Sequence, residues 1–307
     1  MVHKAVHWLS KLIPAFILLT LVGCRPSDPL PTALPTEIPT LPSSTIALPS
    51  PSPPTHTPVA LAARVNGDEI TLQEFHSELE RYRVAMGETG MNLATDEEQY
   101  VLSDIIDQLL LAQAAVESGF LVSQEMLDSR LEELAGELGG RQVLVEWMSA
   151  QGYREDEFQK SLSRAIAAAW MRDNLANSVP EQMEQVHARQ ILVFDAEAAQ
   201  NVLGRLAAGK NFEELAYEFD PVLGGDLGWF PKGYLAQADL DEAVFSLEPG
   251  QTSLVIETEL GFHILYLIEV ADQRMLSPDA WLSMQVNVLQ SWLGERRSTS
   301  DIQYLLP

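Results

Sequence analysis

The stretch that decides the fold is Gly224-Gly225-Asp226-Leu227-Gly228-Trp229-Phe230. Three glycines within five positions indicate a tight loop, because glycine adopts positive φ angles without steric cost. Asp226 lies between them, and an aspartate in such a loop commonly accepts hydrogen bonds from nearby backbone amides. We therefore expect Asp226 to cap the loop rather than act on a substrate, and we do not interpret the glycines as a phosphate cradle.

The segments around this loop alternate between strand and helix patterns. Val186–Val193 predicts a strand, and Asp195 and Asn211 each predict the N-cap of a short helix. After the loop come a predicted helix and two predicted strands, at 239–247, 252–257 and 263–270. This mixed order predicts an α+β domain with a largely antiparallel sheet.

Five motifs in this region occur in a recognisable order. They are Ala188-Arg189-Gln190-Ile191-Leu192-Val193, Lys210-Asn211-Phe212-Glu213-Glu214-Leu215-Ala216, Gly224–Gly228, Leu247-Glu248-Pro249-Gly250-Gln251, and Thr258-Glu259-Leu260-Gly261-Phe262-His263-Ile264. Together they resemble the parvulins, a family of peptidyl-prolyl cis/trans isomerases. The resemblance implies a four-stranded, mainly antiparallel sheet with helices over residues 181–272, and catalysis without a metal or cofactor.

The resemblance also implies a catalytic set. His263 matches the second histidine of the family, Thr258 matches the threonine beside it, and Asp220 corresponds to the cysteine or aspartate position. Gln190 occupies the position of the first histidine; its amide donates and accepts hydrogen bonds but does not titrate near neutral pH. Gln190 is therefore either a working site residue or a sign that catalysis has decayed. The loop that follows Asp220 is shorter than in the family.

A proline-binding pocket is the second implication of the resemblance. Its lining is expected from Leu235, Leu240, Phe245 and Phe230. Phospho-directed parvulins carry a basic cluster after the first strand, where this chain has Asp195-Ala196-Glu197-Ala198. Residues 186–270 contain four basic and fourteen acidic residues, so a phosphoserine-proline ligand would be repelled. Unmodified or basic client chains are the expected substrates.

The regions on either side of this domain are predicted to be helical. Residues 59–180 open with a hairpin turn at Asn66-Gly67, and Thr71 with Glu74 forms a capping box. Further helices are expected from Thr95, from Ser123 to the Gly139-Gly140 pair, and over 155–177. Residues 273–307 add a helix capped by Ser277-Pro278 that carries Trp281 and Trp292 on an apolar face.

This arrangement is similar to extracytoplasmic foldases of the PrsA and SurA kind. In that family the N- and C-terminal helical pieces form one all-α chaperone domain, with the isomerase domain inserted between them. The resemblance implies that the helix in 273–307 packs on the helical region 59–180. Its client proteins would be unfolded or newly exported chains with exposed X–Pro segments.

The N-terminal region predicts a membrane anchor. Residues 1–23 have the length and apolar core of a signal peptide, and Leu21-Val22-Gly23-Cys24 resembles the lipobox of bacterial lipoproteins. Cys24 is the single cysteine of the chain and the expected lipidation site. Residues 24–58 hold 11 of the 18 prolines, which predicts an extended tether of roughly 100 Å at about 3.1 Å per residue.

Composition narrows the function classes. The formal net charge is −25, which argues against binding to a nucleic-acid backbone. One cysteine and six scattered histidines argue against a disulfide framework or a zinc enzyme. The sequence thus predicts a lipid-anchored prolyl isomerase with chaperone activity. The alternative is a non-enzymatic holdase whose parvulin-like domain only binds peptides; the oligomeric state stays open.

Overall fold

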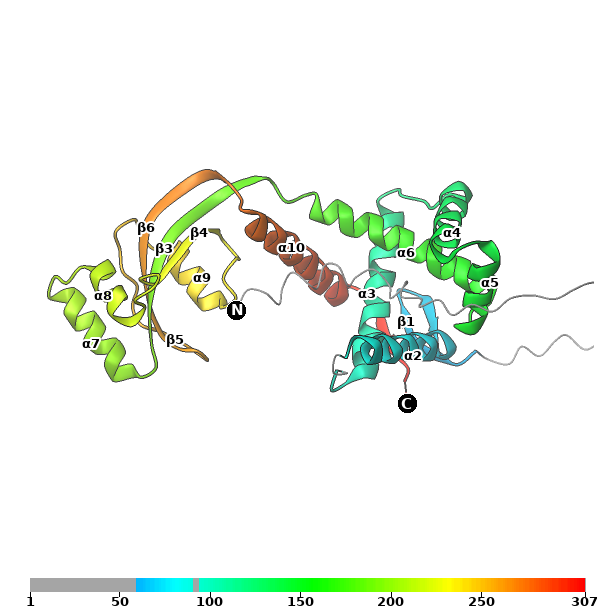
Figure 1. The fold of residues 1–307 in the computed structure, drawn as a ribbon, viewed down its shortest axis with the longest axis horizontal. Helices are drawn as coiled ribbons and strands as arrows, with labels where there is room; N and C mark the ends of the chain where they lie inside the picture. The colour runs from blue at the N-terminus through cyan, green and yellow to red at the C-terminus, as the bar shows by residue number, and fades with distance from the viewer. Residues whose placement is uncertain (1–58, 91–93, 307) are drawn as a thin grey trace, which may run out of the picture. The chain divides into compact units, whose positions relative to one another are not determined.

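The computed structural model describes residues 59–90 and 94–306 (Figure 1). The signal peptide, the lipidation site at Cys24 and the tether predicted over 24–58 lie outside the described residues. The chain divides into two compact units. The first comprises the described residues of Met1–Ser103, with Glu125–Phe158 and the C-terminal residues from Ile302, and the second comprises Asp104–Gln124 and Gln159–Asp301.

The first unit combines helices with a small sheet. Its helices are α2 (Leu72–Thr89), α4 (Gln124–Leu138) and α5 (Arg141–Ala150), and its strands are β1 (Leu61–Val65), β2 (Asp68–Thr71) and β7 (Ile302–Tyr304). Two further helices, α3 (Glu97–Glu117) and α6 (Glu155–Ala176), begin in this unit and continue into the second. The strand order is β2-β1-β7.

Several local predictions for this unit are confirmed. Asn66 and Gly67 have φ angles of 52° and 93° in the turn between β1 and β2, as a type I′ hairpin requires. The Thr71 hydroxyl accepts a hydrogen bond from the Glu74 amide at 3.0 Å, so the capping residue is correct. The capping residue predicted at Thr95 is one residue early, since α3 begins at Glu97 and Asp96 directly precedes it.

Two elements of this unit were not predicted. Helix α5 follows the Gly139-Gly140 stop after only a short break, and its ten residues bury Leu144 and Met148. Strand β7 is three residues long and pairs with β1 from the far end of the chain, with Tyr304 opposite Ala63. The predicted hairpin, formed by β1 and β2, is therefore extended by β7 to a three-stranded sheet in a domain that the family resemblance implied to be all-α.

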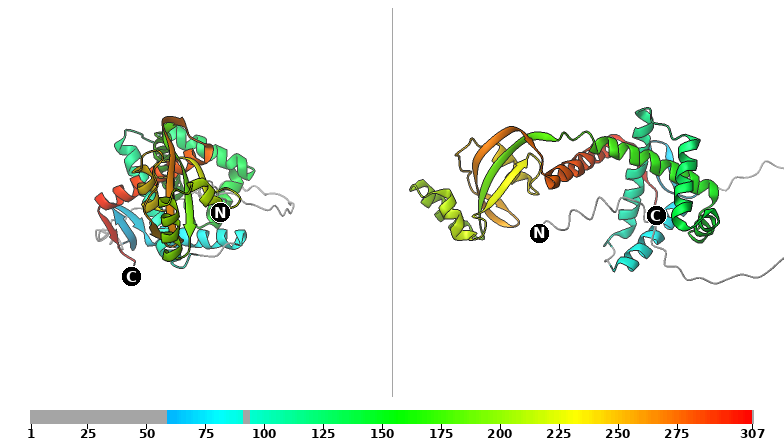
Figure 2. Two further views of the ribbon diagram at one scale, coloured as in Figure 1. Left: turned by 90° about the vertical axis from the view of Figure 1, so that its left-hand side faces the viewer. Right: turned by 45° about the horizontal axis from the view of Figure 1, so that its top comes forward.

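The second unit is built around a four-stranded antiparallel sheet in the order β4-β3-β6-β5. The strands are β3 (Gln182–Val193), β4 (Asp226–Pro231), β5 (Ile256–Thr258) and β6 (Gly261–Met275), and the helices between them are α7 (Ala196–Ala207), α8 (Phe212–Phe219) and α9 (Ala238–Phe245). The long strands β3 and β6 lie side by side in both views of Figure 2. The α+β class and antiparallel sheet are confirmed.

The two faces of this sheet bury different cores. Ile191, Val193 and Ile264 pack against α7 and α8 through Val202 and Phe212. On the other face, a second cluster joins the sheet to α9; its buried members are Val186, Ala188, Phe230, Leu240, Val244, Leu265 and Leu267. Figure 1 shows α7 and α8 on one side of the sheet and α9 on the other.

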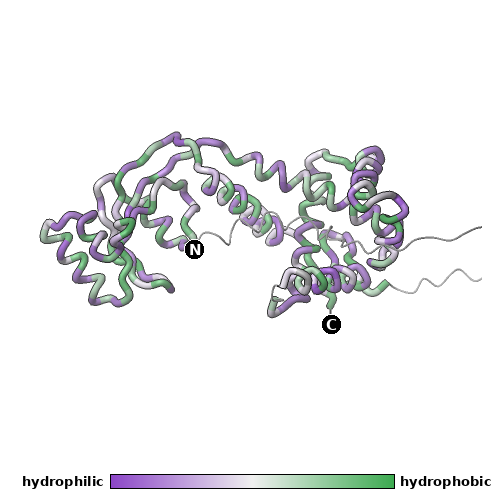
Figure 3. The backbone as a smooth tube through the Cα atoms, in the orientation of Figure 1, coloured by the Kyte–Doolittle hydropathy of each residue, from purple (hydrophilic) through white to green (hydrophobic). Residues whose placement is uncertain are grey.

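The short helices follow from their caps and their amphipathic pattern. Asp195 and Asn211 accept hydrogen bonds from the amides three residues on, at 2.7 and 3.1 Å, which confirms both predicted N-caps. Hydrophobic and hydrophilic residues alternate along α7 and α8 (Figure 3). Each helix can therefore bury one apolar stripe against the sheet while its other side faces solvent.

Helix α10 (Pro278–Thr299) also belongs to the second unit. Ser277 caps it by accepting from the Ala280 amide at 3.2 Å. Leu289, Trp292 and Leu293 pack against a buried cluster that α3 and α6 provide. Trp281 remains 38% exposed, so only one of the two predicted tryptophans lies in that interface.

Candidate active site

Three of the predicted catalytic residues form one chain of hydrogen bonds. The Gln190 Oε1 atom lies 3.1 Å from His263 Nδ1, and the Thr258 hydroxyl lies 2.8 Å from His263 Nε2. Gln190 comes from β3, His263 from β6 and Thr258 from β5. The register of the sheet brings them together, because His263 pairs with Leu192 on one side and with Ile256 on the other.

The donors of this chain can be assigned by elimination. The Gln190 Oε1 atom can only accept, so His263 Nδ1 donates to it and the Nε2 atom of a neutral ring must accept. The Thr258 hydroxyl then donates to Nε2, while it accepts from the Leu260 amide at 3.1 Å. The Gln190 Nε2 group has no acceptor among the described residues. It is therefore a donor that a ligand could use.

His263 is held in its neutral form. Its residue surface is 2% exposed, and burial lowers the pKa of the imidazole below its usual value of 6.5. Because Gln190 does not titrate, the chain carries no net charge at neutral pH. The site is thus polar and uncharged.

The glycine loop fixes the backbone of Gln190. The Gln190 amide donates to the Gly225 carbonyl at 2.8 Å. A Cβ atom added to Gly225 would lie 1.9 Å from the Gln190 carbonyl oxygen, so only glycine permits this approach. The sequence indicated the positive φ of Gly225, which is 64°, but not this contact.

Asp220 acts on the loop and not on His263. Its carboxylate accepts from the amides of Val222, Leu223 and Gly225 at 3.1, 3.2 and 3.0 Å. The Leu223 and Gly225 amides, with a smaller effect from Val222, hold the pKa of Asp220 below its usual range. The structure therefore does not bring Asp220 into the hydrogen-bond chain. Because the loop after Asp220 is short, the Asp220 carboxylate lies within hydrogen-bond distance of the loop amides, including that of Gly225. Gly225 in turn contacts the backbone of Gln190, so Asp220 positions Gln190 only indirectly.

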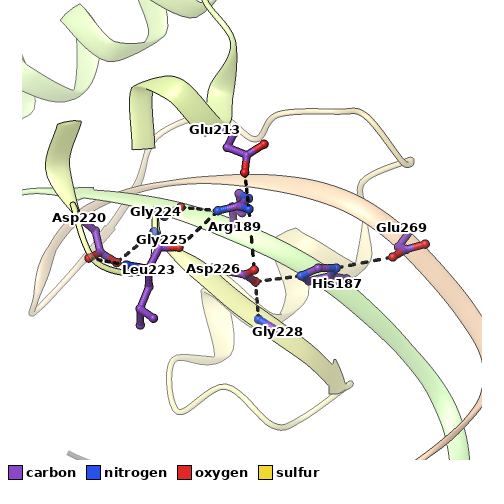
Figure 4. A network of polar contacts seen from close by, with 10 residues as sticks. All are labelled: His187, Arg189, Glu213, Asp220, Leu223, Gly224, Gly225, Asp226, Gly228 and Glu269. Carbon is purple, nitrogen blue, oxygen red and sulfur yellow. Dashed lines mark hydrogen bonds and ion pairs between the residues drawn. The ribbon is translucent and has the colours of Figure 1, made fainter. Parts of the chain in front are cut away.

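A second polar network braces the loop from the α8 side of the sheet (Figure 4). Arg189 donates to the Gly224 carbonyl at 2.9 Å and to Glu213 at 2.8 Å. Asp226 accepts from the Gly228 amide and lies 2.9 Å from His187 Nε2. The loop-capping role expected for Asp226 is thus present, with His187 as an added partner.

The charge on Asp226 is stabilised by this network. Burial is the largest single influence and by itself would raise the pKa of Asp226. The Gly228 amide, His187 and Arg189 together outweigh it, so the pKa falls below the usual range. Asp226 is therefore an anion at neutral pH, on the opposite face of the sheet from the uncharged chain.

The four predicted pocket residues divide into two kinds. Phe230 is fully buried and Leu240 is 4% exposed, so these two offer a ligand no surface in this conformation. Leu235 and Phe245 pack at the edge of the same cluster and stay partly exposed. The sequence pattern could not separate them, because pocket and core positions are both apolar.

The segment that carries Leu235 is held from two sides. The buried Asp241 accepts from the amides of Gly233 and Leu235 at 2.8 and 3.4 Å. Asn287 of α10 donates to the Gly233 carbonyl at 2.7 Å. Leu235 is therefore fixed in place, although neither supporting residue was predicted from the sequence.

Within 59–90 and 94–306, no group of three or more His, Cys, Asp or Glu side chains is arranged to hold a metal ion. No helix in the same described ranges has both the length and the hydropathy needed to cross a membrane.

Comparison with known families agrees with this geometry. Residues 181–269 match the PPIC-type PPIASE domain, a rotamase family, and residues 50–172 match the SurA-like N-terminal domain. The chain therefore contains a parvulin-type peptidyl-prolyl isomerase domain and a SurA-like domain. The PrsA and SurA resemblance and the isomerase class predicted from the sequence are confirmed.

Individual relatives are named as foldases. Foldase protein PrsA of Bacillus subtilis is 26% identical over 79% of this chain and 82% of its own length. Foldase protein PrsA of Halalkalibacterium halodurans is 28% identical over 77% of this chain and 71% of its own. A crystal structure of peptidylprolyl isomerase PrsA from Bacillus cereus aligns over 78% of this chain and 86% of that one, at 20% identity and a TM-score of 0.43.

The close approach at Gly225 predicts a stability difference between two glycines. Gly228→Ala, at a φ of 69° with open space around its Cβ, should cost about 1–2 kcal/mol for the left-handed backbone alone. Gly225→Ala has the same backbone cost plus a clash with Gln190, so we expect a loss of about 4 kcal/mol or more. Urea denaturation of both variants measures this. Equal losses would show that the contact does not constrain the loop.

The buried His263 predicts a pH dependence. In the unfolded chain its pKa is about 6.5, and in the folded protein it is lower. As the pH falls below about 6.5 the unfolded chain takes up a proton first, so stability should decline until the folded pKa is reached. NMR titration of the imidazole, assigned with His263→Gln, should give a midpoint below that of the protein in 8 M urea. A midpoint at or above the unfolded value would contradict a desolvated ring.

Proposed function

We propose that this chain is an extracytoplasmic foldase that isomerises X–Pro bonds in exported proteins and also binds unfolded segments as a chaperone. The observation that carries the proposal is the uncharged chain Gln190–His263–Thr258, on the same face of the sheet as the apolar cluster that partly exposed Leu235 and Phe245 join. The isomerase class of the domain and the foldase relatives support the same reading.

The chemistry requires no bond to be broken. Rotation about an X–Pro bond has a barrier of about 18–20 kcal/mol, because the amide loses its conjugation at the twisted midpoint. There the prolyl nitrogen regains a lone pair and becomes a better hydrogen-bond acceptor. A donor that meets this nitrogen only in the twisted state lowers the barrier, since it binds the transition state more strongly than the planar amide.

We assign the donor role to Gln190 Nε2. His263 holds the Oε1 end of the same amide, which leaves the nitrogen directed to other partners, and Thr258 in turn fixes the tautomer of His263. A positioned hydrogen bond of about 1–3 kcal/mol corresponds to roughly a five- to hundredfold rate increase. His263 and Thr258 are therefore proposed to orient the donor, and Asp220 to position it through Gly225.

The apolar residues would hold the proline ring. Leu235 and Phe245 are the candidates for direct contact, and the buried Phe230 and Leu240 would support them from within the core. Burial of His263 also keeps water from the neighbouring hydrogen bonds, where a lower local dielectric strengthens them. The proposed substrate is an unmodified X–Pro segment, since acidic residues surround the domain.

The rest of the chain would place this site outside the cytoplasm. We propose a signal peptide over 1–23, lipid attachment at Cys24 to a bacterial membrane, and a spacer over 24–58. The proposed domains are then a chaperone-like region over 59–180, the isomerase over 181–272 and a C-terminal helical piece over 273–307. Packing of α10 on α3 and α6 supports this continuity between the two helical regions.

Two observations favour a second function. Gln190 replaces a histidine, and the Asp220 carboxylate is occupied by three amides. A domain with these features could bind X–Pro segments without accelerating their isomerisation. The protein would then be a holdase, and the following experiment separates the two.

The first test compares catalysis in two histidine variants. Exchange NMR of the peptide Ala-Leu-Pro-Phe with the full-length protein in detergent should show faster cis/trans exchange. His263→Ala should reduce the acceleration at least tenfold, because it releases Gln190. His76→Ala, which removes an exposed histidine of α2 outside both polar networks, should leave the rate within twofold of wild type. Peptide binding without acceleration in the wild type would establish the holdase.

The second test concerns the anchor. Cys24→Ser removes the only thiol that a lipid could modify, so we expect the protein to move from the membrane fraction to the soluble fraction. The apolar core within residues 1–23 is shorter than the roughly 20 residues of a membrane-spanning helix. Stable anchoring would therefore need a covalent lipid. Retention of the serine variant on the membrane, to the same extent as wild type, would refute lipid attachment there.

A further inference from the structure

The turn that leads to Leu235 is held by side chains from two different helices. It begins at Pro231, the last residue of β4, and the Tyr234 amide closes it by donating to the Pro231 carbonyl at 3.2 Å. Gly233, its third residue, has a φ of 86°, a value typical of the third position of a type II turn. Leu235 is the first residue after this turn, so the placement of Leu235 depends on how the turn is held.

Both backbone polar groups of Gly233 are bonded to side chains. Its amide donates to Asp241 of α9 at 2.8 Å, and its carbonyl accepts from Asn287 of α10 at 2.7 Å. Asp241 is 5% exposed and also accepts from the Leu235 amide at 3.4 Å. Helix α9 lies within the isomerase domain matched over 181–269, whereas α10 follows that domain in the chain. The turn is therefore held partly by a residue outside the isomerase domain.

Helix α10 is itself held on its other side. Gln285 is 9% exposed and donates to the Ala176 carbonyl, at the end of α6, at 3.3 Å. Residues two apart on an α-helix are rotated by roughly 200° about its axis, so Gln285 and Asn287 lie on opposite sides of α10. Further along the helix, Trp292 packs against the buried cluster of α3 and α6. Helix α10 therefore connects the turn before Leu235 to α3 and α6.

The placement of Leu235 bears on substrate binding more than on the twisting step. Leu235 packs on the apolar cluster below it and is a candidate for direct contact with the proline ring. The ring keeps its shape while the amide twists, so this contact is equal in the planar and twisted states and affects KM without changing kcat. A turn that holds the binding conformation for only part of the time lowers the apparent affinity by that fraction.

We propose that Asn287 is a positioning residue of the isomerase, which acts through Gly233 to keep Leu235 in place for the proline ring. The inference rests on the proposed isomerase function, to which it adds a residue outside the isomerase domain. Helix α10 then has a second role beside its packing on α3 and α6. A displacement of α10 away from Gly233 lowers the affinity for X–Pro segments.

The test is an isosteric change, studied in the full-length protein in detergent. Asn287→Asp keeps the size of the side chain and removes the N–H donor that the Gly233 carbonyl accepts. We expect KM for Ala-Leu-Pro-Phe to rise about three- to tenfold, as for the loss of one hydrogen bond. The kcat should stay within about twofold of wild type, because the donor to the twisting amide is untouched. Exchange NMR over a series of peptide concentrations gives both constants.

Two further variants separate positioning from a general effect of charge or folding. Gln290→Glu makes the same amide-to-carboxylate change at an exposed residue of α10 and should leave KM unchanged. Asn287→Gln retains an amide donor and should keep KM within about twofold of wild type. The proposal is wrong if Asn287→Asp keeps the wild-type KM, if it lowers kcat without raising KM, or if either of the other two variants raises KM as much as Asn287→Asp does.

Failure of the isomerase function would be seen separately. If the wild type does not accelerate exchange, NMR titration of the same peptide gives a dissociation constant in place of KM. A dissociation constant that rises in Asn287→Asp and not in Gln290→Glu supports the positioning role in a peptide-binding protein. Equal dissociation constants in the wild type and both variants, or no binding to the wild type, overturn it.

Discussion

The contact between Gly225 and the backbone of Gln190 is the constraint on which the site depends. The Gly225 carbonyl accepts from the Gln190 amide at 2.8 Å, and no side chain at Gly225 could fit in the space that remains. This approach fixes where β3 presents the Gln190 side chain. Asp220 holds the loop from one end through three amides, and Arg189 holds it through the Gly224 carbonyl.

The sheet separates two electrostatic environments. On the α9 side, Gln190, His263 and Thr258 form an uncharged chain next to an apolar cluster. On the α8 side, Arg189 and Asp226 carry charges that ion pairs and amides stabilise (Figure 4). The charged groups that position the glycine loop thus lie on the opposite face of the sheet from the uncharged chain, where the X–Pro amide of a substrate would twist. A neutral site suits this reaction, because the twisted amide loses polarity as conjugation is broken.

Local sequence patterns predicted much of this fold for physical reasons that act over short distances. The caps at Thr71, Asp195, Asn211 and Ser277 were correct, because an N-cap depends on amides only two or three residues away. Strand β7 was missed, since its three residues are stabilised by pairing with β1 at the other end of the chain.

The same distinction between local and long-range interactions explains which features of the site could be predicted from the sequence. The ordered parvulin motifs placed Gln190, His263 and Thr258 in one site, and the structure brings these three together. The motifs did not show that Asp220 turns back on its own loop, because that depends on the loop length. Nor could they separate buried Phe230 from partly exposed Leu235, since packing alone decides which apolar side chain reaches the surface.

The central claim is that the Gln190 amide donates to the twisting bond in place of a histidine. The most direct measurement is kcat/KM for isomerisation of Ala-Leu-Pro-Phe with Gln190→Leu, which keeps the approximate size but removes the donor, and with Gln190→His. The account predicts a roughly five- to hundredfold loss for Gln190→Leu, in line with one lost hydrogen bond of about 1–3 kcal/mol, and substantial activity for Gln190→His. Wild-type activity in Gln190→Leu would contradict it.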